Sequence, residues 1–134
     1  MGYDVFVRRF VGGDSSPAPF SEVAAILQKY GTIEESPFGG LQFLPTNDDI
    51  CEIGFIDGDQ DSGVAGIMFS RPRDKLPPII FDLLGIQGMS YFEQDVIHLF
   101  ARSDITTELP EGLAAASAAG RLTIISSASE IYPD

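Results

Sequence analysis

The chain has very few of the residues that build disulfides, metal centres and redox sites. Cys51 is its single cysteine, His98 is its single histidine, and tryptophan is absent. One cysteine cannot form an internal disulfide. One cysteine with one histidine also falls short of the ligand set of a structural zinc site. Aromatic packing must therefore come from the ten phenylalanines and four tyrosines.

Basic residues are scarce as well. Eight Lys and Arg stand against 20 Asp and Glu, for a formal net charge of −12, and no base occurs between Lys29 and Arg71. That interval holds eight acids: Glu34, Glu35, Asp48, Asp49, Glu52, Asp57, Asp59 and Asp61. Such a negative field repels phosphate backbones and anionic lipids, so we expect no binding to nucleic acid or to membranes. It favours a basic protein partner instead.

Long apolar runs are missing too. The most apolar stretch, residues 76–88, contains Pro77, Pro78 and Asp82. It is also shorter than the roughly 20 apolar residues that a membrane-spanning helix needs. The first residues lack the basic start and apolar run of a signal peptide. We therefore expect a cytoplasmic protein.

The apolar pattern predicts one α+β domain over residues 1–134, with a mostly antiparallel sheet, two main helices and a peripheral Ala-rich helix. The expected strands cover 3–10, 41–44, 50–56, 64–69, 89–92, 96–101 and 122–125. The expected helices cover 19–30, ended by Gly31, a second segment that starts at Pro77, and 110–119. We expect 12–17 to be a flexible loop and 126–134 to be a mobile tail.

Two hairpins are expected within this sheet. Strands 50–56 and 64–69 flank a turn over 57–63, whose Asp, Gly and Ser content is typical of turns. The second hairpin turns at 93–95. Gly54 and Gly66 lie inside the first pair of strands, where a missing side chain often marks a bulge or a close approach of two backbones.

Three aspartates in the first turn resemble part of a calcium-binding loop. Asp57, Asp59 and Asp61 match its first, third and fifth positions. The match then fails, because Ser62 stands where the turn glycine is needed and Met68 where the bidentate Glu is needed. We predict no metal ligand here. A small metal-binding or hydrolytic domain that uses the three aspartates stays as an alternative.

The other reactive side chains have structural explanations. His98 shares an apolar run with Val96 and Phe100, which favours a packed histidine over a general base. Cys51 lies near Asp49 and Glu52, and neighbouring acids disfavour a reactive thiolate. Neither a phosphate-binding glycine loop nor a G-x-S-x-G nucleophile elbow is present. We therefore predict no catalytic residue, no cofactor and no enzyme activity.

The whole chain resembles the immunity proteins of bacterial toxin systems, such as those of type VI secretion and contact-dependent inhibition. The resemblance lies in small size, acidity and the lack of catalytic motifs, so it brings no functional residue with it. It implies a protein that binds and neutralises a cognate toxin enzyme. An alternative from another class is a structural subunit that self-associates through the Ala-rich helix.

The acidic interval supplies the candidate binding site. We predict that its central acids face a basic cleft on the toxin-like partner, with apolar anchors that the sequence does not identify. The predicted binding residues are Asp48, Asp49, Glu52, Asp57, Asp59 and Asp61.

Overall fold

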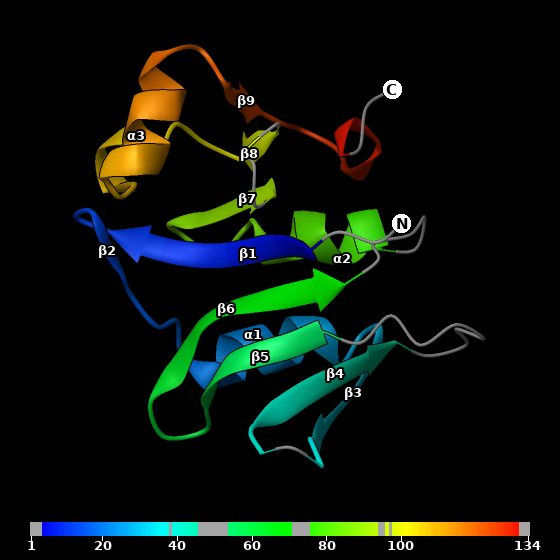
Figure 1. Cartoon of the computed structure of the whole chain (residues 1–134). Helices are drawn as coiled ribbons and strands as arrows, with labels where there is room; N and C mark the ends of the chain where they lie inside the picture. Colours follow the sequence, from blue (N-terminus) through cyan, green and yellow to red (C-terminus); the bar gives the residue numbers. More distant parts are fainter. Residues whose placement is uncertain are drawn as a thin grey trace.

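A computed structural model of the chain describes residues 4–37, 39–45, 54–70, 76–93, 96 and 98–131. In these residues, nine strands form one sheet that three α-helices accompany (Figure 1). The strands are β1 (Asp4–Val11), β2 (Asp14–Ser15), β3 (Gly31–Glu35), β4 (Leu41–Pro45), β5 (Gly54–Asp59), β6 (Gly63–Ser70), β7 (Met89–Glu93), β8 (Leu99–Ala101) and β9 (Leu122–Ile124). The helices are α1 (Phe20–Leu27), α2 (Leu76–Leu83) and α3 (Glu111–Ala118), and two 3₁₀ turns are η1 (Thr106–Glu108) and η2 (Ala128–Glu130).

The sheet is mixed, and the α+β class is confirmed. Its strand order is β3-β4-β5-β6-β1-β7-β8-β9, and β2 pairs with β1 alone. Strands β8 and β9 are parallel, while the other pairings in the described part of the chain are antiparallel. Both predicted hairpins, β5–β6 and β7–β8, are confirmed. Strand β1 lies between them and joins them into one surface.

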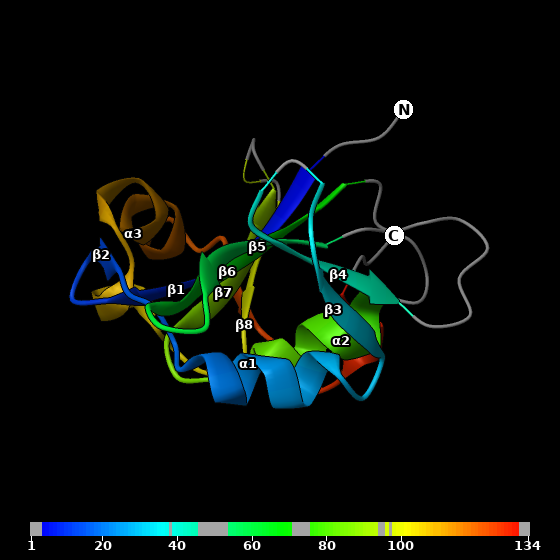
Figure 2. The same cartoon turned by 90° about the horizontal axis from the view of Figure 1, so that it is seen from below.

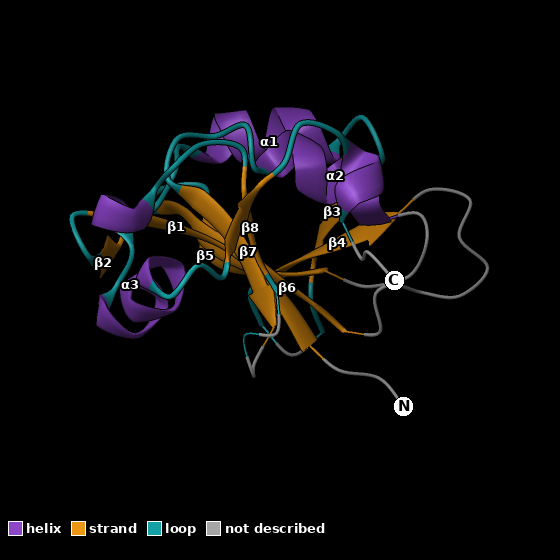
Figure 3. Cartoon of the chain, turned by 90° about the horizontal axis from the view of Figure 1, so that it is seen from above, coloured by secondary structure: helices purple, strands orange, loops and turns teal. Residues whose placement is uncertain are grey.

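Helices α1 and α2 cover one face of this sheet (Figure 3). From β1, Val5 and Val7 point into this core and are fully buried, as the period-two pattern predicts. From α1, Val23 and Leu27 bury the apolar stripe of the helix. Burying one such aliphatic side chain contributes about 1.5–3 kcal/mol. The hydrophobic effect therefore holds the helices on this face.

Helix α3 lies on the opposite side of the sheet from α1 and α2 (Figure 2). It packs over a second apolar cluster that contains Leu99 and Ala101, whereas Phe100 between them belongs to the main core. Leu113 is the only buried residue that α3 contributes. Gly120, at φ +88°, ends the helix as expected. The helix is thus peripheral, and it covers only the β8–β9 end of its face.

Two predicted boundaries at the N-terminal half are wrong. Helix α1 ends at Leu27, and Gly31 begins the unpredicted strand β3 instead of ending the helix. A Cβ at Gly31 would lie 2.1 Å from the carbonyl oxygen of Leu44, so glycine is needed for close strand contact. The expected loop over 12–17 contains strand β2, because Gly12 and Gly13 adopt positive φ and fold the chain back onto β1.

Three further boundaries differ from the prediction. Asp57 and Asp59 belong to β5 instead of the turn, and the register of the β5–β6 ladder shifts at a bulge between Asp57 and Gly58. Val96, expected in a strand, lies at φ +52° in the turn after β7. Glu93, expected in that turn, is the last residue of β7. Residues 50–53 of the expected third strand lie outside the described part of the chain.

The expected mobile tail is a packed segment as far as Ile131. Ile125 and Ile131 are buried in the main core. Between them, the Glu130 carboxylate accepts hydrogen bonds from the backbone N–H groups of Ser126 at 2.6 Å and Ser127 at 3.0 Å. Ser127 and Glu130 form a capping box around η2. The tail was mispredicted because its two anchoring isoleucines are separated by five small or polar residues.

Candidate functional site

A row of apolar side chains crosses the sheet on the face opposite α1 and α2. Phe92 of β7 lies opposite Phe6 of β1, and Phe6 lies opposite Met68 of β6. Met68 lies in turn opposite Phe55 of β5. The rings of Phe6 and Phe92 stack with their centroids 5.5 Å apart. We call these four residues the apolar row.

The apolar row is covered at one end only. Phe92 packs against the cluster beneath α3, whereas Phe55, at the other end, is 40 % exposed. Phe6 and Met68 between them are half-buried. Contiguous apolar side chains on an accessible sheet face are often a site of contact with another molecule, so the apolar row is a candidate binding site.

A charged pair lies beside the apolar row on the same face. Arg8 Nη2 donates a hydrogen bond to Asp57 Oδ2 at 2.8 Å. The two residues come from β1 and β5 and reach across β6, where Gly66 lies opposite both. A Cβ at Gly66 would lie 2.7 Å from Arg8 Cγ and 2.7 Å from the carbonyl oxygen of Val7. Of the two features expected at Gly66, a bulge or a close approach of two backbones, the structure shows the close approach, and Arg8 and Asp57 meet across it.

Asp59 holds the turn that follows β5. Its Oδ1 accepts hydrogen bonds from the backbone N–H groups of Ser62 at 2.6 Å and Asp61 at 2.9 Å. The bond from Ser62, and then that from Asp61, lower the pKa of the Asp59 carboxyl. Asp61 is exposed at the same turn. The carboxylate of Asp59 therefore stabilises the turn through these hydrogen bonds. The side chain of Asp61 faces solvent.

The turn borders an open acidic hollow of about 530 Å³. One wall is the β3–β4 turn with Glu35, Gly39 and Gly40, and the other is the β5–β6 turn with Asp59 and Asp61. The two turns lie side by side at the bottom of the molecule in Figure 1. Three carboxylates therefore surround a space that glycines keep free of side chains. We call this surface the acidic end.

The acidic end does not have the arrangement of a metal centre. Among the residues that the structure describes, no three His, Cys, Asp or Glu side chains are grouped so that they could hold one metal ion. Asp57 already binds Arg8, and Asp59 already binds its own turn. The aspartates at 57, 59 and 61 share one hairpin but have three different environments.

The other half of the predicted site lies outside the described residues: Asp48, Asp49, Glu52, and with them Cys51. The apolar row was missed altogether, although its four residues all lie in segments that were expected to be strands. Alternation shows which residues share a face but does not show which face the helices cover. The four residues line up because β7, β1, β6 and β5 pair in one register. This register depends on contacts between distant parts of the sequence.

His98 is held by a buried carboxylate that the sequence did not indicate. Its Nδ1 lies 2.6 Å from Glu93 Oε2, and its backbone N–H donates to Glu93 Oε1 at 2.7 Å. The Tyr91 hydroxyl donates to the same carboxylate at 3.4 Å, and the imidazole stacks on Phe100 at 5.5 Å. Glu93 is 4 % exposed. The interpretation of His98 as a packed histidine agrees with these contacts, and the pair closes the β7–β8 hairpin.

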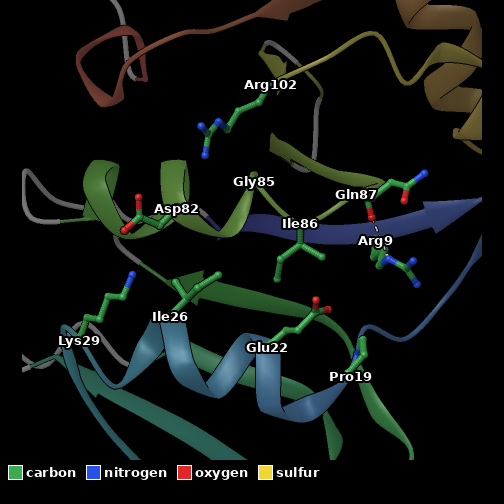
Figure 4. A pocket seen from close by; sticks show the side chains of 10 residues that line it. All are labelled: Arg9, Pro19, Glu22, Ile26, Lys29, Asp82, Gly85, Ile86, Gln87 and Arg102. Carbon is green, nitrogen blue, oxygen red and sulfur yellow. Dashed lines mark hydrogen bonds between the residues drawn. The ribbon is translucent and has the colours of Figure 1, made fainter.

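A second hollow, of about 700 Å³, lies between α1 and the segment that joins α2 to β7 (Figure 4). Arg9, Lys29 and Arg102 line it together with Glu22 and Asp82. Two of the cations are already bound. Arg9 donates to the carbonyl oxygens of Gln87 at 2.8 Å and Pro17 at 3.0 Å, and the Arg102 guanidinium lies 4.1 Å from the centre of the Phe81 ring.

One acid of this second hollow, Asp82, also has a structural role. The Tyr30 hydroxyl donates a hydrogen bond to Asp82, which links the end of α1 to α2. This hydrogen bond, with burial and the negative charge of Asp82, raises the pKa of Tyr30. The hollow therefore contains charges of both signs, and Arg9, Arg102 and Asp82 already have partners within the chain.

No helix in the described residues is both long and apolar enough to cross a membrane. Comparison of the chain with protein-family models, with curated proteins and with solved structures gives no match. The apolar row and the acidic end are therefore the two surface features of the described residues that indicate a function.

Proposed function

We propose that this chain is a protein-binding inhibitor of the toxin-immunity type, which neutralises a basic toxin enzyme by covering its active-site cleft. The observation that carries the proposal is the apolar row, exposed at Phe55 and bordered by acids. Protein interfaces commonly combine an apolar centre, enriched in Phe and Met, with a polar rim. The face opposite α1 and α2 has this composition. The proposal places the chain in the cytoplasm and gives it no catalytic residue.

The apolar row and the acidic end contribute to binding in different ways. Phe55 and Met68 supply area that loses water on binding, and aromatic anchors of this kind dominate affinity. The acidic end, with the net charge of −12, attracts a basic cleft over a distance and raises the association rate. Added salt should therefore slow association more than it speeds dissociation.

The proposal is tested by growth protection. The open reading frame next to the gene for this chain is expressed in a host cell, alone and together with this chain. We expect growth arrest in the first case and growth in the second. Arrest that this chain does not relieve, although both proteins are made in soluble form, contradicts the proposal.

The anchors are tested in the purified complex. The double variant Phe55→Ala/Met68→Ala should weaken binding at least about tenfold, mainly through faster dissociation. Val11→Ala is the matched control, because Val11 is 41 % exposed yet lies outside the apolar row. Equal losses in the two variants would show that exposed apolar area has no special role in this row.

The charges are tested separately from the anchors. Neutralising the acidic end with Glu35→Gln/Asp61→Asn should lower the association rate and reduce its dependence on salt. Glu111→Gln on α3 is the control, because Glu111 is an exposed acid on another element. Unchanged association in the first variant would leave the acidic end as a solubilising surface.

A further inference from the structure

Strand β3 is an edge of the sheet. In the strand order it has β4 on one side, and no strand of the described residues pairs with its other side. Figure 1 shows it beneath β4 at the bottom of the sheet. An edge strand has a row of backbone N–H and C=O groups that can pair with another chain.

The hydrogen bonds of the β3–β4 hairpin show which backbone groups point outward. The Ser36 N–H donates to the Gly40 carbonyl at 2.9 Å, which makes these two residues a hydrogen-bonded pair. Such pairs alternate along an antiparallel ladder. In the observed register Glu34 and Gln42 form the next one. The N–H and C=O groups of Ile33 and Glu35 therefore point away from β4.

The negative charge of this edge favours a basic strand over a second copy of this chain as the partner. Glu34 and Glu35 are exposed, and no base occurs between Lys29 and Arg71. A second copy of this chain, paired through the same edge, would bring acids against acids, and like charges directly opposite each other are destabilising. A strand with Lys or Arg opposite Glu34 gains attraction from the same geometry.

The edge also continues the surface already described. Glu34 lies opposite Gln42, and Gln42 lies opposite Phe55, so two polar residues lie in line with the apolar row between Phe55 and the edge of the sheet. On the other face of β3, Glu35 lines the acidic hollow. A strand added to this edge would extend the face that contains the apolar row and would border the acidic end.

We infer that the partner adds a basic β-strand to the outer edge of β3, with a Lys or Arg opposite Glu34. This inference rests on the proposed function, because it names how a basic protein partner is held. Backbone hydrogen bonds to Ile33 and Glu35 give the pairing, and the charge of Glu34 gives the preference for a basic strand.

The first test uses the unmodified chain and a synthetic probe, a nine-residue peptide that alternates lysine with valine. At saturating peptide, we expect amide exchange of Ile33 and Glu35 to slow at least about tenfold. The Glu34 amide, already bonded to β4, should change less. A peptide that is N-methylated on the edge facing β3 should give no such protection. Equal effects of both peptides, or no protection by the first, would overturn the inference.

The second test changes the edge itself. Proline at position 35 removes an outward N–H without removing a β3–β4 hydrogen bond, because proline is tolerated where the N–H of an edge strand faces solvent. Glu35→Gln is the matched control, since it removes the charge and keeps the N–H. Glu35→Pro should bind the lysine–valine peptide about tenfold more weakly than Glu35→Gln. Equal affinity would overturn strand addition.

The tests separate the two proposals. Growth protection without amide protection at Ile33 and Glu35 would refute strand addition and leave the inhibitor function intact. Failure of growth protection refutes the inhibitor function whatever the peptide does. Self-association that protects the same two amides in the absence of peptide would replace the basic strand with a second copy and overturn the inference.

Discussion

Asp59 and Glu93 occupy equivalent positions in two hairpins and have opposite surroundings. Each is the last residue of the first strand, and each carboxylate accepts hydrogen bonds from residues that follow in the turn. Asp59 is exposed and, among the described residues, accepts hydrogen bonds from N–H and O–H groups of its own turn. Glu93 is buried and binds the imidazole and the backbone of His98.

The two carboxylates differ in how much they contribute to the stability of the fold. A buried carboxylate is tolerated only with its partners in place, so the β7–β8 hairpin depends on the Glu93–His98 contact. The β5–β6 hairpin depends less on Asp59, because water can replace the lost hydrogen bonds at an exposed turn. The first hairpin can therefore vary in sequence and carry a binding surface, while the second contributes to the interior.

The largest expected effect is at Glu93. Replacing Glu93 by Ala should destabilise the protein by about 3 kcal/mol, since it removes a buried partner of His98. Glu93→Gln keeps an acceptor of similar shape and should cost about 1–2 kcal/mol. Urea unfolding followed by circular dichroism measures both. A loss below about 0.5 kcal/mol for Glu93→Ala would show that the pair is not a structural contact.

The next effect is at Gly66, within the exposed hairpin. Gly66→Ala should destabilise the protein by about 1–3 kcal/mol, because the new Cβ meets the backbone of Val7 and the side chain of Arg8. Gly112→Ala in α3 is the control. A Cβ there meets no atom within 4 Å, and alanine favours a helix by up to about 1 kcal/mol. Thermal unfolding of the two variants should give shifts of opposite sign.

The effect at Asp59 should be smaller and dependent on pH. Because hydrogen bonds lower the pKa of the folded carboxyl, its stabilisation is fully present above the ordinary pKa of about 4. It is lost as the pH falls through the lowered value. Asp59→Asn should therefore be less stable than the parent at pH 7, with a difference that shrinks below about pH 4. Urea midpoints measured from pH 7 to pH 2.5 check this, and a difference that grows toward acid would contradict it.

The smallest effect is expected for Arg8 and Asp57. Their side chains are 26 % and 62 % exposed, and exposed ion pairs contribute about 0–1 kcal/mol. A double-mutant cycle with Arg8→Met and Asp57→Asn should give a coupling energy in that range, which 0.5 M salt reduces further. A coupling above about 2 kcal/mol would mean that Gly66 places the pair in a more protected site than its exposure indicates.

Much of the fold could be predicted from local sequence patterns. Period-two alternation located most of β1 and β6, and the apolar stripe of α1 followed the helical period. Prolines at the start of α2 and Gly120 after α3 marked helix ends. Each of these features depends on residues a few positions apart, which is why one sequence was enough to find them.

The main failures depend on distant contacts. Strand β3 was missed because Gly31 was interpreted as a helix end, while its role is to admit the backbone of Leu44. The packing of Ile131 depends on a core formed by strands far away in the sequence. The apolar row depends on four strands in register, and the pairing of Asp57 depends on Arg8, 49 residues before it. The sequence therefore identified Asp57, Asp59 and Asp61 as a group of acids but did not predict the separate contacts that each of them makes.

We propose that the partner contacts the apolar row, the edge of β3 and the acidic end, and leaves α1 and the hollow of Arg9 and Arg102 free. Hydrogen exchange of the chain with and without its purified toxin partner tests this claim most directly. We predict slower exchange in β3, in β5 around Phe55 and in the turn from Asp59 to Gly63. Exchange in α1 and around the hollow of Arg9 and Arg102 should stay unchanged. Protection confined to α1 and that hollow would contradict the account.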